Sequence, residues 1–176
     1  MTSTDSDFAA SDVIELVRLF DQHHIDVCID GGWGVDALLG KQTRRHADLD
    51  IAIQHKDSAR ARALLEAQGY TEAPRPDTRE CNYVMGDDLG HLIDIHTYTF
   101  DEEGNLVYGV AYPYESLKGT GSILGQAVKS ITPEWMVKFH TGYPIDENDY
   151  HDVKALCQYF GFPIPEEYHD FMTRDH

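Results

Sequence analysis

Residues 30–53, DGGWGVDALLGKQTRRHADLDIAI, bring together residue types that bind phosphate groups and metal ions. Side chains alternate between the two faces of a β-strand, so Asp48 and Asp50 would project from the same face of one strand. Two carboxylates this close repel each other unless a cation lies between them. Oxygen ligands without a nearby cysteine favour Mg²⁺, or Mn²⁺ in its place, over zinc. On its own, such a pair is equally typical of a solvated strand face.

A third carboxylate follows in the segment LIDIH. The same alternation predicts that Ile93 and Ile95 face the core, while Asp94 and His96 share the opposite face. Asp94 would then complete a site for two divalent ions about 3.5 to 4 Å apart. Sites of this kind catalyse phosphoryl or nucleotidyl transfer.

A glycine pair, Gly31 and Gly32, follows a predicted strand. Glycine leaves the backbone N–H groups unscreened, and a helix starting at Trp33 would add its N-terminal partial positive charge, so the pair predicts a cradle for phosphates. A basic cluster whose charge would neutralise a triphosphate comes next: Lys41, Arg44, Arg45 and His46. Arg44 and His46 are the predicted nucleotide ligands within it. Each feature alone also fits an ordinary turn or loop, but their order before the aspartate pair is specific.

Three residues are candidates for substrate contact: Trp33, His96 and Tyr98. Trp33 fits the core better than a stacking position on a base. His96 flanks the acids, although histidines on strand faces more often serve as hydrogen-bonded residues than as ligands. Aromatic residues near the third acid would either line a pocket for a ring of the substrate or pack within the sheet: Tyr98, Phe100, Tyr108, Tyr112 and Tyr114.

Apolar periodicity predicts the elements that position these side chains. Helices are expected over residues 12–24, 33–40 and 57–68, and strands over 25–31, 48–53, 82–86 and 91–98. Asp12 and Asp57 are the expected N-terminal caps of the first and third helices, and Gly40 ends the second. Residues 106–131 show no clear period.

The C-terminal part again predicts helices, from Pro133 onward, between Asp146 and Gly161, and over residues 165–171. The order of elements predicts an α+β fold, a mixed sheet with flanking helices and a helical C-terminal part. The expected division is a loose tail over residues 1–10, a core over 11–130 and a helical subdomain over 131–176 packed on the core.

Composition narrows the classes of partner. The 176-residue chain has 31 acidic and 14 basic residues and a net charge of -17. This balance argues against nucleic acid and anionic membranes and suits either a cationic partner or simple solubility. Three distant cysteines predict neither a disulfide framework nor a zinc site and fit a reducing cytoplasm. No signal peptide is recognisable, and no apolar run approaches the roughly 18 residues of a membrane span.

Residues 30–53, together with LIDIH and FHTGYPIDENDYHDV further on, resemble the antibiotic nucleotidyltransferases of the lincosamide and aminoglycoside adenylyltransferase group, in the DNA polymerase β-like superfamily. The resemblance covers residues 12–168, and the small lincosamide type is the most similar in length and motif order. It implies the fold of that superfamily. One departure is Ala52, where lincosamide-type relatives commonly carry an acid, so the drug pocket is expected to differ.

The resemblance implies a role for each motif residue. Gly31 and Gly32 would hold the β and γ phosphates of ATP, Asp48 and Asp50 would bind two Mg²⁺ ions, and Asp94 would bind one ion and act as the base. The reaction would move AMP to a drug hydroxyl, on a lincosamide in the first instance and on an aminoglycoside in the second. A homodimer in which the second subunit walls the drug site would suit this fold. Two alternatives stay open: a metal-dependent phosphohydrolase and a non-catalytic, antitoxin-like member of the fold.

Overall fold

A mixed β-sheet forms the centre of the computed structural model, which describes residues 7–175. Within these residues the strand order is β3-β4-β5-β2-β1-β8-β7, with β6 paired to β5. β2 runs antiparallel to β1 and parallel to β5. The strands are β1 Val27–Asp30, β2 Asp48–Gln54, β3 Thr71–Glu72, β4 Asn82–Gly86, β5 Leu92–Phe100, β6 Leu106–Gly109, β7 Gly119–Ile123 and β8 Gln126–Ser130.

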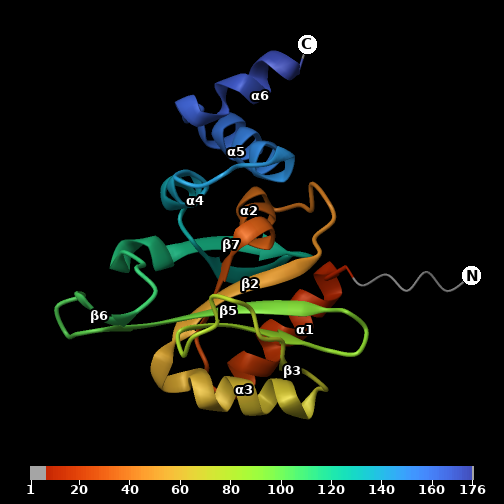
Figure 1. The fold of residues 1–176 in the computed structure, drawn as a ribbon, viewed down its shortest axis with the longest axis vertical. Coiled ribbons are helices and arrows are strands. Elements are labelled where there is room, and N and C mark those ends of the chain that lie inside the picture. The colour runs from red at the N-terminus through yellow and green to blue at the C-terminus, as the bar shows by residue number, and fades with distance from the viewer. Residues whose placement is uncertain (1–6, 176) are drawn as a thin grey trace, which may run out of the picture.

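Helices cover both faces of the sheet (Figure 1). α1 and α3 lie on one side, whereas α2, α4, α5 and α6 are stacked on the other. The helices are α1 Ala10–Gln22, α2 Gly31–Leu39, α3 Ser58–Ala67, α4 Pro133–Phe139, α5 Glu147–Phe160 and α6 His169–Arg174, with short 3₁₀ turns at His55–Asp57, Tyr114–Lys118 and Glu166–Tyr168. The predicted α+β architecture, with a helical part after the sheet, is confirmed.

Strand alternation sorts the side chains between two apolar clusters. Leu49 and Ile51 on β2 and Ile93 and Ile95 on β5 are fully buried in the cluster beneath α1 and α3. The intervening residues point to the other face, where α4 and α5 pack. The polar side chains predicted to do chemistry therefore share one face of the sheet.

The N-terminal helix begins earlier than predicted. It starts at Ala10 rather than at Asp12, and the Asp12 carboxylate reaches back to accept the backbone N–H of Ala9 at 3.1 Å. Residues 1–6 of the predicted tail lie outside the described residues. Phe8 is only 1% exposed, and its N–H donates to the carbonyl of His46 at 2.8 Å. Ordered packing thus starts before residue 11, because burial of an aromatic ring fixes this segment.

Two other helix starts differ from the predictions. α2 begins at Gly31 instead of Trp33, because Asp30 caps it by accepting the Gly31 N–H at 2.8 Å. Asp57 makes no side-chain cap on α3 and pairs with Arg60 at 2.6 Å. The predicted helix end at Gly40 is confirmed by its left-handed φ of 75°.

The C-terminal helices follow the predictions more closely. Pro133 opens α4, and the Asp146 carboxylate accepts the Asp149 N–H at 2.9 Å as the cap of α5. Gly161 ends α5 with a φ of 78°. The stretch from 106 to 131 that lacked a period contains three short strands and one 3₁₀ turn. None of the helices in residues 7–175 combines the length and apolar character needed to span a bilayer.

Candidate functional site

Three carboxylates meet on the face of the sheet beneath the C-terminal helices. Asp48 and Asp50 lie on β2, and Asp94 lies on the neighbouring parallel strand β5. The register pairs Asp50 directly with Asp94, so these two are adjacent across the strands. The structure thereby brings together the three residues predicted as catalytic.

The environment opposes ionisation of these carboxylates. Burial, followed by repulsion from Asp48, Asp94 and Asp30, raises the pKa of Asp50 well above its ordinary value of 3.8. Burial also raises the pKa of Asp94. One oxygen of Asp94, Oδ1, is buried and has no hydrogen-bond partner. Buried carboxylates that repel one another and lack hydrogen-bond donors are typical of a position that binds a cation.

The donor set fits a divalent metal ion in its chemistry. All three candidate ligands are carboxylates, which suit Mg²⁺ or Mn²⁺. A bound cation would satisfy the Asp94 oxygen that makes no hydrogen bond, and it would relieve the repulsion at Asp50. In residues 7–175, no three His, Cys, Asp or Glu side chains already surround a common metal position. Binding would therefore require the carboxylates to rotate towards the ion.

The glycine pair forms the first turn of α2, directly beside the acids. Gly31 has a φ of 59°, and a Cβ there would lie 2.0 Å from Oδ2 of Asp50. A Cβ on Gly32 would lie 2.6 Å from Nη2 of Arg44 and 2.6 Å from Nδ1 of His46. The site thus needs glycine at both positions for close approach. The first N–H groups of α2 lack carbonyl partners within the helix and so suit phosphate oxygens; the Gly31 N–H donates to Oδ1 of Asp30 at 2.8 Å in this structure.

A hydrogen-bonded chain connects the third acid to the start of α2. The Tyr112 hydroxyl donates to Oδ2 of Asp30 at 2.8 Å and lies 3.0 Å from Nδ1 of His96. Because the Tyr112 proton goes to Asp30, His96 must donate from Nδ1. Its Nε2 then faces Oδ1 of Asp94 at 3.4 Å. These contacts fix the orientation of the imidazole beside Asp94.

The basic cluster is largely engaged in the fold. Arg44 makes a two-point ion pair with Asp152 of α5, with Nε–Oδ1 and Nη2–Oδ2 distances of 2.9 and 2.8 Å. Arg45 pairs with Asp7 at 2.5 Å. Arg44 still borders the cavity described below, as the prediction of a nucleotide ligand requires.

Three other predicted ligands lie away from the cavity. His46 is 2% exposed, and its Nε2 lies 2.6 Å from Oδ2 of Asp36. Trp33 is buried against the His46 ring, and its indole N–H donates to the Phe8 carbonyl at 3.0 Å. Tyr98 is buried in the cluster under α4 and α5. Internal hydrogen bonds engage the polar groups of Trp33 and Nε2 of His46, burial holds Tyr98, and none of the three residues lines the cavity.

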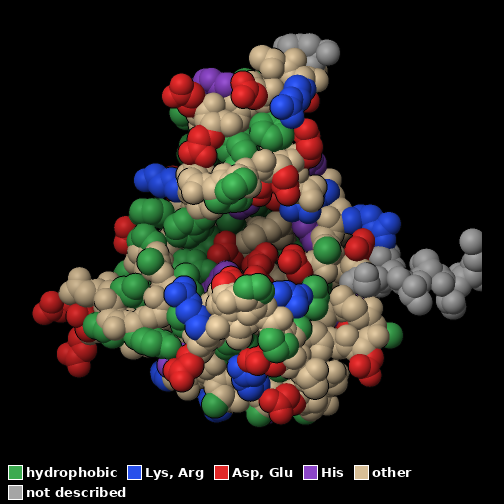
Figure 2. Space-filling view, viewed as in Figure 1, with side chains coloured by type: hydrophobic (Ala, Val, Ile, Leu, Met, Phe, Trp, Pro, Cys, Tyr) green, Lys and Arg blue, Asp and Glu red, His purple; other side chains and the backbone are tan. Residues whose placement is uncertain are grey.

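A cavity of about 700 Å³ opens between the acids, the glycine pair and the C-terminal helices. Figure 2 shows acidic side chains gathered in this hollow. Asp94 lies just beyond its edge, next to Asp50. The lining residues are Asp7, Asp30, Gly31, Gly32, Arg44, Arg45, Ala47, Asp48, Asp50, His96, Phe139, His140, Tyr143, Asp146, Asn148, Asp149 and Asp152.

Several of these lining residues were not predicted from the sequence. Asp30 directly precedes the glycine pair, and its preference for helix N-caps was a usable signal. Asp152 carries no local signal, because its partner Arg44 is 108 residues away. Asp149, which accepts a hydrogen bond of 2.9 Å from the Tyr143 hydroxyl, enters the cavity only because α5 packs over it.

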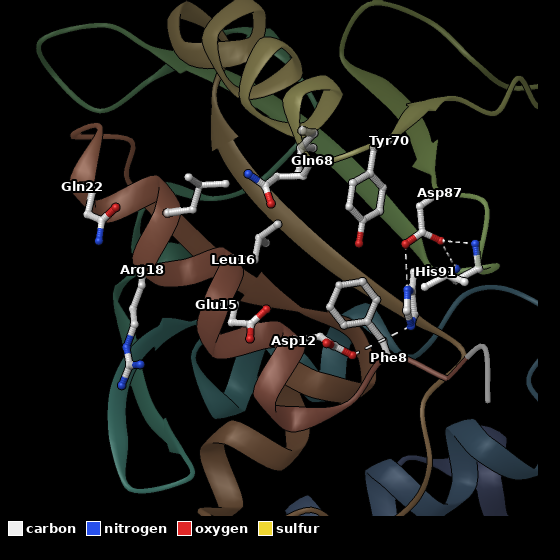
Figure 3. A pocket seen from close by; sticks show the side chains of 13 residues that line it. Phe8, Asp12, Glu15, Leu16, Arg18, Gln22, Gln68, Tyr70, Asp87 and His91 are labelled. Carbon is white, nitrogen blue, oxygen red and sulfur yellow. Dashed lines mark hydrogen bonds and ion pairs between the residues drawn. The ribbon is translucent and has the colours of Figure 1, made fainter. Parts of the chain in front are cut away.

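A separate cavity of about 450 Å³ lies on the opposite face of the sheet, beside α1 (Figure 3). Leu16 and Leu65 contribute apolar surface to it, and His91 Nδ1 pairs with Oδ2 of Asp87 at 2.8 Å. None of the predicted site residues lines this second cavity. The candidate chemistry is therefore confined to the face that carries the three aspartates.

Comparison with known proteins relates most of the chain to one family of enzymes. A profile of the family described as aminoglycoside-2''-adenylyltransferase matches residues 12–156. The chain is 29% identical over 148 residues to a lincosamide resistance protein of Staphylococcus haemolyticus, a match that covers 80% of this chain and 89% of that protein.

Solved structures show the same fold. The crystal structure of a lincosamide antibiotic adenylyltransferase, LnuA, with lincomycin bound superposes with a TM-score of 0.75 and 24% identity, over 85% of this chain and 97% of that chain. ANT(2'')-Ia in complex with adenylyl-2''-tobramycin gives a TM-score of 0.71 and 19% identity, over 86% and 89%. The predicted polymerase β-like nucleotidyltransferase fold is confirmed.

Proposed function

This chain belongs to the aminoglycoside-2''-adenylyltransferase family, and we propose that it transfers AMP from ATP to a hydroxyl of an antibiotic, a lincosamide in the first instance. The observation that carries the proposal is the meeting of Asp48, Asp50 and Asp94 beside the glycine turn of α2, at the edge of a cavity of about 700 Å³. Glycine N–H groups and carboxylates are the two donor types that a metal-bound nucleotide requires.

Each side chain has a distinct task in the proposed reaction. The N–H groups of Gly31 and Gly32 bind the β and γ phosphates, the Gly31 N–H after it exchanges Oδ1 of Asp30 for a phosphate oxygen, and Arg44 borders the same cavity. Asp48, Asp50 and Asp94 would hold Mg²⁺, two ions in the full site, with Mn²⁺ as a substitute. When bound, the metal neutralises phosphate charge and aligns the reacting oxygens.

Asp94 is the proposed base. It takes the proton of the drug hydroxyl, whose oxygen forms a bond to the α-phosphorus of ATP. The bond from the α-phosphorus to its bridging oxygen breaks, and pyrophosphate leaves with the electron pair. His96, whose Nε2 is 3.4 Å from Oδ1 of Asp94, orients that carboxylate when its imidazole carries a proton on both nitrogens. Since no covalent intermediate is needed, orientation and charge complementarity supply the rate enhancement.

The cavity suits a cationic acceptor. Its aspartates outnumber its arginines, so a protonated amine of a drug is attracted to it. The lincosamide is favoured because the relative matched over most of both chains is a lincosamide resistance protein. An aminoglycoside is the second candidate, favoured by the family profile and by the number of carboxylates lining the cavity.

The setting of the reaction is also proposed. Cys28, Cys81 and Cys157 are buried free thiols, which suits a reducing cytoplasm that also supplies ATP. A homodimer stays a prediction, and sedimentation at several protein concentrations would test it.

Mass spectrometry tests the proposal directly. The protein is incubated with ATP, Mg²⁺ and a panel of lincosamides and aminoglycosides, with the Asp50→Asn variant as the inactive control. An added AMP on a lincosamide supports the first assignment, and one confined to aminoglycosides supports the second. Release of inorganic phosphate without any adduct would instead indicate the phosphohydrolase. Failure to bind Mg²⁺ and ATP in calorimetry would indicate a non-catalytic member of the fold.

A further inference from the structure

A smaller cavity of about 150 Å³ lies on the far side of the three acids from the glycine pair. Its walls include Asp48, Asp94, Val84 and three residues of the loop between β3 and β4, namely Arg75, Asp77 and Thr78. We call it the loop pocket. It shares Asp48 with the larger cavity and borders Asp94, which the larger cavity does not.

The strand order fixes the position of the loop pocket relative to the nucleotide site. Gly31 follows β1, the aspartate pair is on β2, Asp94 is on β5 and Val84 is on β4. These four strands are consecutive neighbours in the sheet. With about 4.8 Å between adjacent strands, the glycine turn and the loop pocket flank the carboxylates on opposite sides.

Phosphoryl chemistry requires such an arrangement. In an in-line displacement, the attacking oxygen and the leaving oxygen lie on opposite sides of the phosphorus. Pyrophosphate held at the glycine turn therefore leaves on the β1 side. The acceptor hydroxyl must approach from the β5 side, where Asp94 and the loop pocket lie.

The loop pocket offers polar groups for an incoming hydroxyl. Asp94 lines the pocket, and its buried Oδ1 makes no hydrogen bond, with Nε2 of His96 at 3.4 Å as its nearest basic group. Asp77 is held by Asn82, whose Nδ2 donates to Oδ2 of Asp77 at 3.1 Å, which leaves Oδ1 of Asp77 available. Thr78 braces the loop, because its Oγ1 accepts the N–H of Arg75 at 2.7 Å. Hydrogen bonds within the loop therefore hold its conformation, while the Asp77 carboxylate lines the pocket.

The size of the loop pocket limits what can enter it. An apolar cavity of about 150 Å³ in another protein holds one benzene molecule, so this volume admits a single six-membered ring. A complete drug does not fit. The rest of the acceptor would extend outwards.

We propose that the loop pocket receives the ring that carries the accepting hydroxyl, with Asp77 binding a hydroxyl or ammonium group of that ring and Val84 forming the floor. This inference rests on the proposed function. It makes Asp77 and Val84 determinants of acceptor binding that take no part in nucleotide binding.

The first experiment removes the charge of Asp77. Steady-state kinetics of Asp77→Asn are compared with those of Asp88→Asn, which removes the same charge from an exposed position in the β4–β5 turn. Loss of a charged hydrogen bond is expected to raise KM for the drug by about tenfold or more. KM for ATP should stay within about twofold of the wild-type value, and Asp88→Asn should match wild type in both constants.

The second experiment fills the pocket. Val84 pairs with Asp94 across β4 and β5, so the larger ring in Val84→Phe would occupy the space in front of Asp94. Strands accept phenylalanine readily at half-buried positions. Val107→Phe, at a 61% exposed position of β6, is the matched control. Val84→Phe should lose at least about tenfold in kcat/KM for the drug, while calorimetry with Mg²⁺ and a non-hydrolysable ATP analogue shows unchanged affinity.

The outcomes separate the two proposals. If wild-type protein adenylylates no drug, the proposed function fails before the variants are compared. If wild type is active but Asp77→Asn and Val84→Phe behave like their controls, the acceptor does not use the loop pocket. If either variant weakens binding of the ATP analogue, the loop pocket belongs to the nucleotide, and the inference is overturned.

Discussion

The guanidinium of Arg44 forms a two-point ion pair with the carboxylate of Asp152, which joins the loop before β2 to the middle of α5. Asp152 is 2% exposed in its side chain and Arg44 is 21% exposed. His140 is the other nearby base, at 3.9 Å from Oδ2 of Asp152. This contact fixes the C-terminal helices over the cavity, so it should couple the stability of the two parts of the chain.

Substitution of Arg44 by alanine should destabilise the fold by about 3 to 5 kcal/mol, because it leaves the buried Asp152 carboxylate without its main partner. The double variant with Asp152→Ala should be more stable than the sum of the two single effects predicts. Urea denaturation of the four proteins measures this coupling. Strict additivity would show that the ion pair contributes nothing specific.

The raised pKa of Asp50 should give the protein an unusual dependence of stability on pH. Its pKa is raised in the folded protein, so folding favours the protonated form. The protonated Asp50 side chain contributes its full share to the free energy of unfolding below about pH 3.8, the ordinary pKa of an aspartate. This share is lost as the pH rises through the higher pKa of Asp50 in the folded protein. Each tenfold difference in proton affinity between the two states corresponds to about 1.4 kcal/mol. Without divalent metal, Asp50→Asn should therefore become increasingly more stable than wild type as the pH rises.

Thermal melts in EDTA from pH 4 to 8 measure this difference, and the same series with Mg²⁺ supplies the control. Metal binding should raise the melting temperature of wild type, because the ion relieves the repulsion among Asp48, Asp50 and Asp94. The difference in melting temperature between wild type and Asp50→Asn should then become smaller. A gap that stays constant with pH would show that Asp50 ionises normally in the folded chain.

The parts of the structure set by local pattern were predictable from the sequence. Alternation placed Leu49 and Ile51 in the core and sent Asp48 and Asp50 to the other face. Asp146 and Gly161 bounded α5 because caps and left-handed stops act within a few residues. These predictions needed no knowledge of tertiary contacts.

Positions decided by tertiary packing were not predictable. His46 had the sequence context of a phosphate ligand, yet the buried carboxylate of Asp36 binds its ring. Strand β7 showed no apolar period, because Gly121 is required for close approach: a Cβ there would lie 2.4 Å from the carbonyl oxygen of Ala37. Phe8 was assigned to a loose tail, because a single aromatic residue carries no period.

Tyr112 is expected to act on the reaction through His96. Tyr112→Phe removes the hydroxyl that joins His96 to Asp30 and should lower kcat by about tenfold, as loss of an outer-shell partner typically does. KM for ATP should stay unchanged, because the phenyl ring keeps the packing. The pH profile of kcat should also shift, since the imidazole beside Asp94 loses its fixed orientation. A normal profile with reduced stability alone would reduce Tyr112 to a packing residue.

Gly31 should tolerate no side chain, and comparison with a second glycine distinguishes the effect of backbone strain from that of contact with Asp50. Gly31→Ala places a Cβ at a φ of 59° and 2.0 Å from Oδ2 of Asp50, so the carboxylate must move. Gly40→Ala is the matched control, because its φ of 75° carries similar strain but its nearest contact is Ser122 Oγ at 3.6 Å. Both variants should lose about 1 to 2 kcal/mol of stability from the left-handed backbone. Only Gly31→Ala should also lose turnover and Mg²⁺-dependent ATP binding, measured by kinetics and calorimetry; equal activity in the two variants would mean that Asp50 does not need its position against the glycine turn.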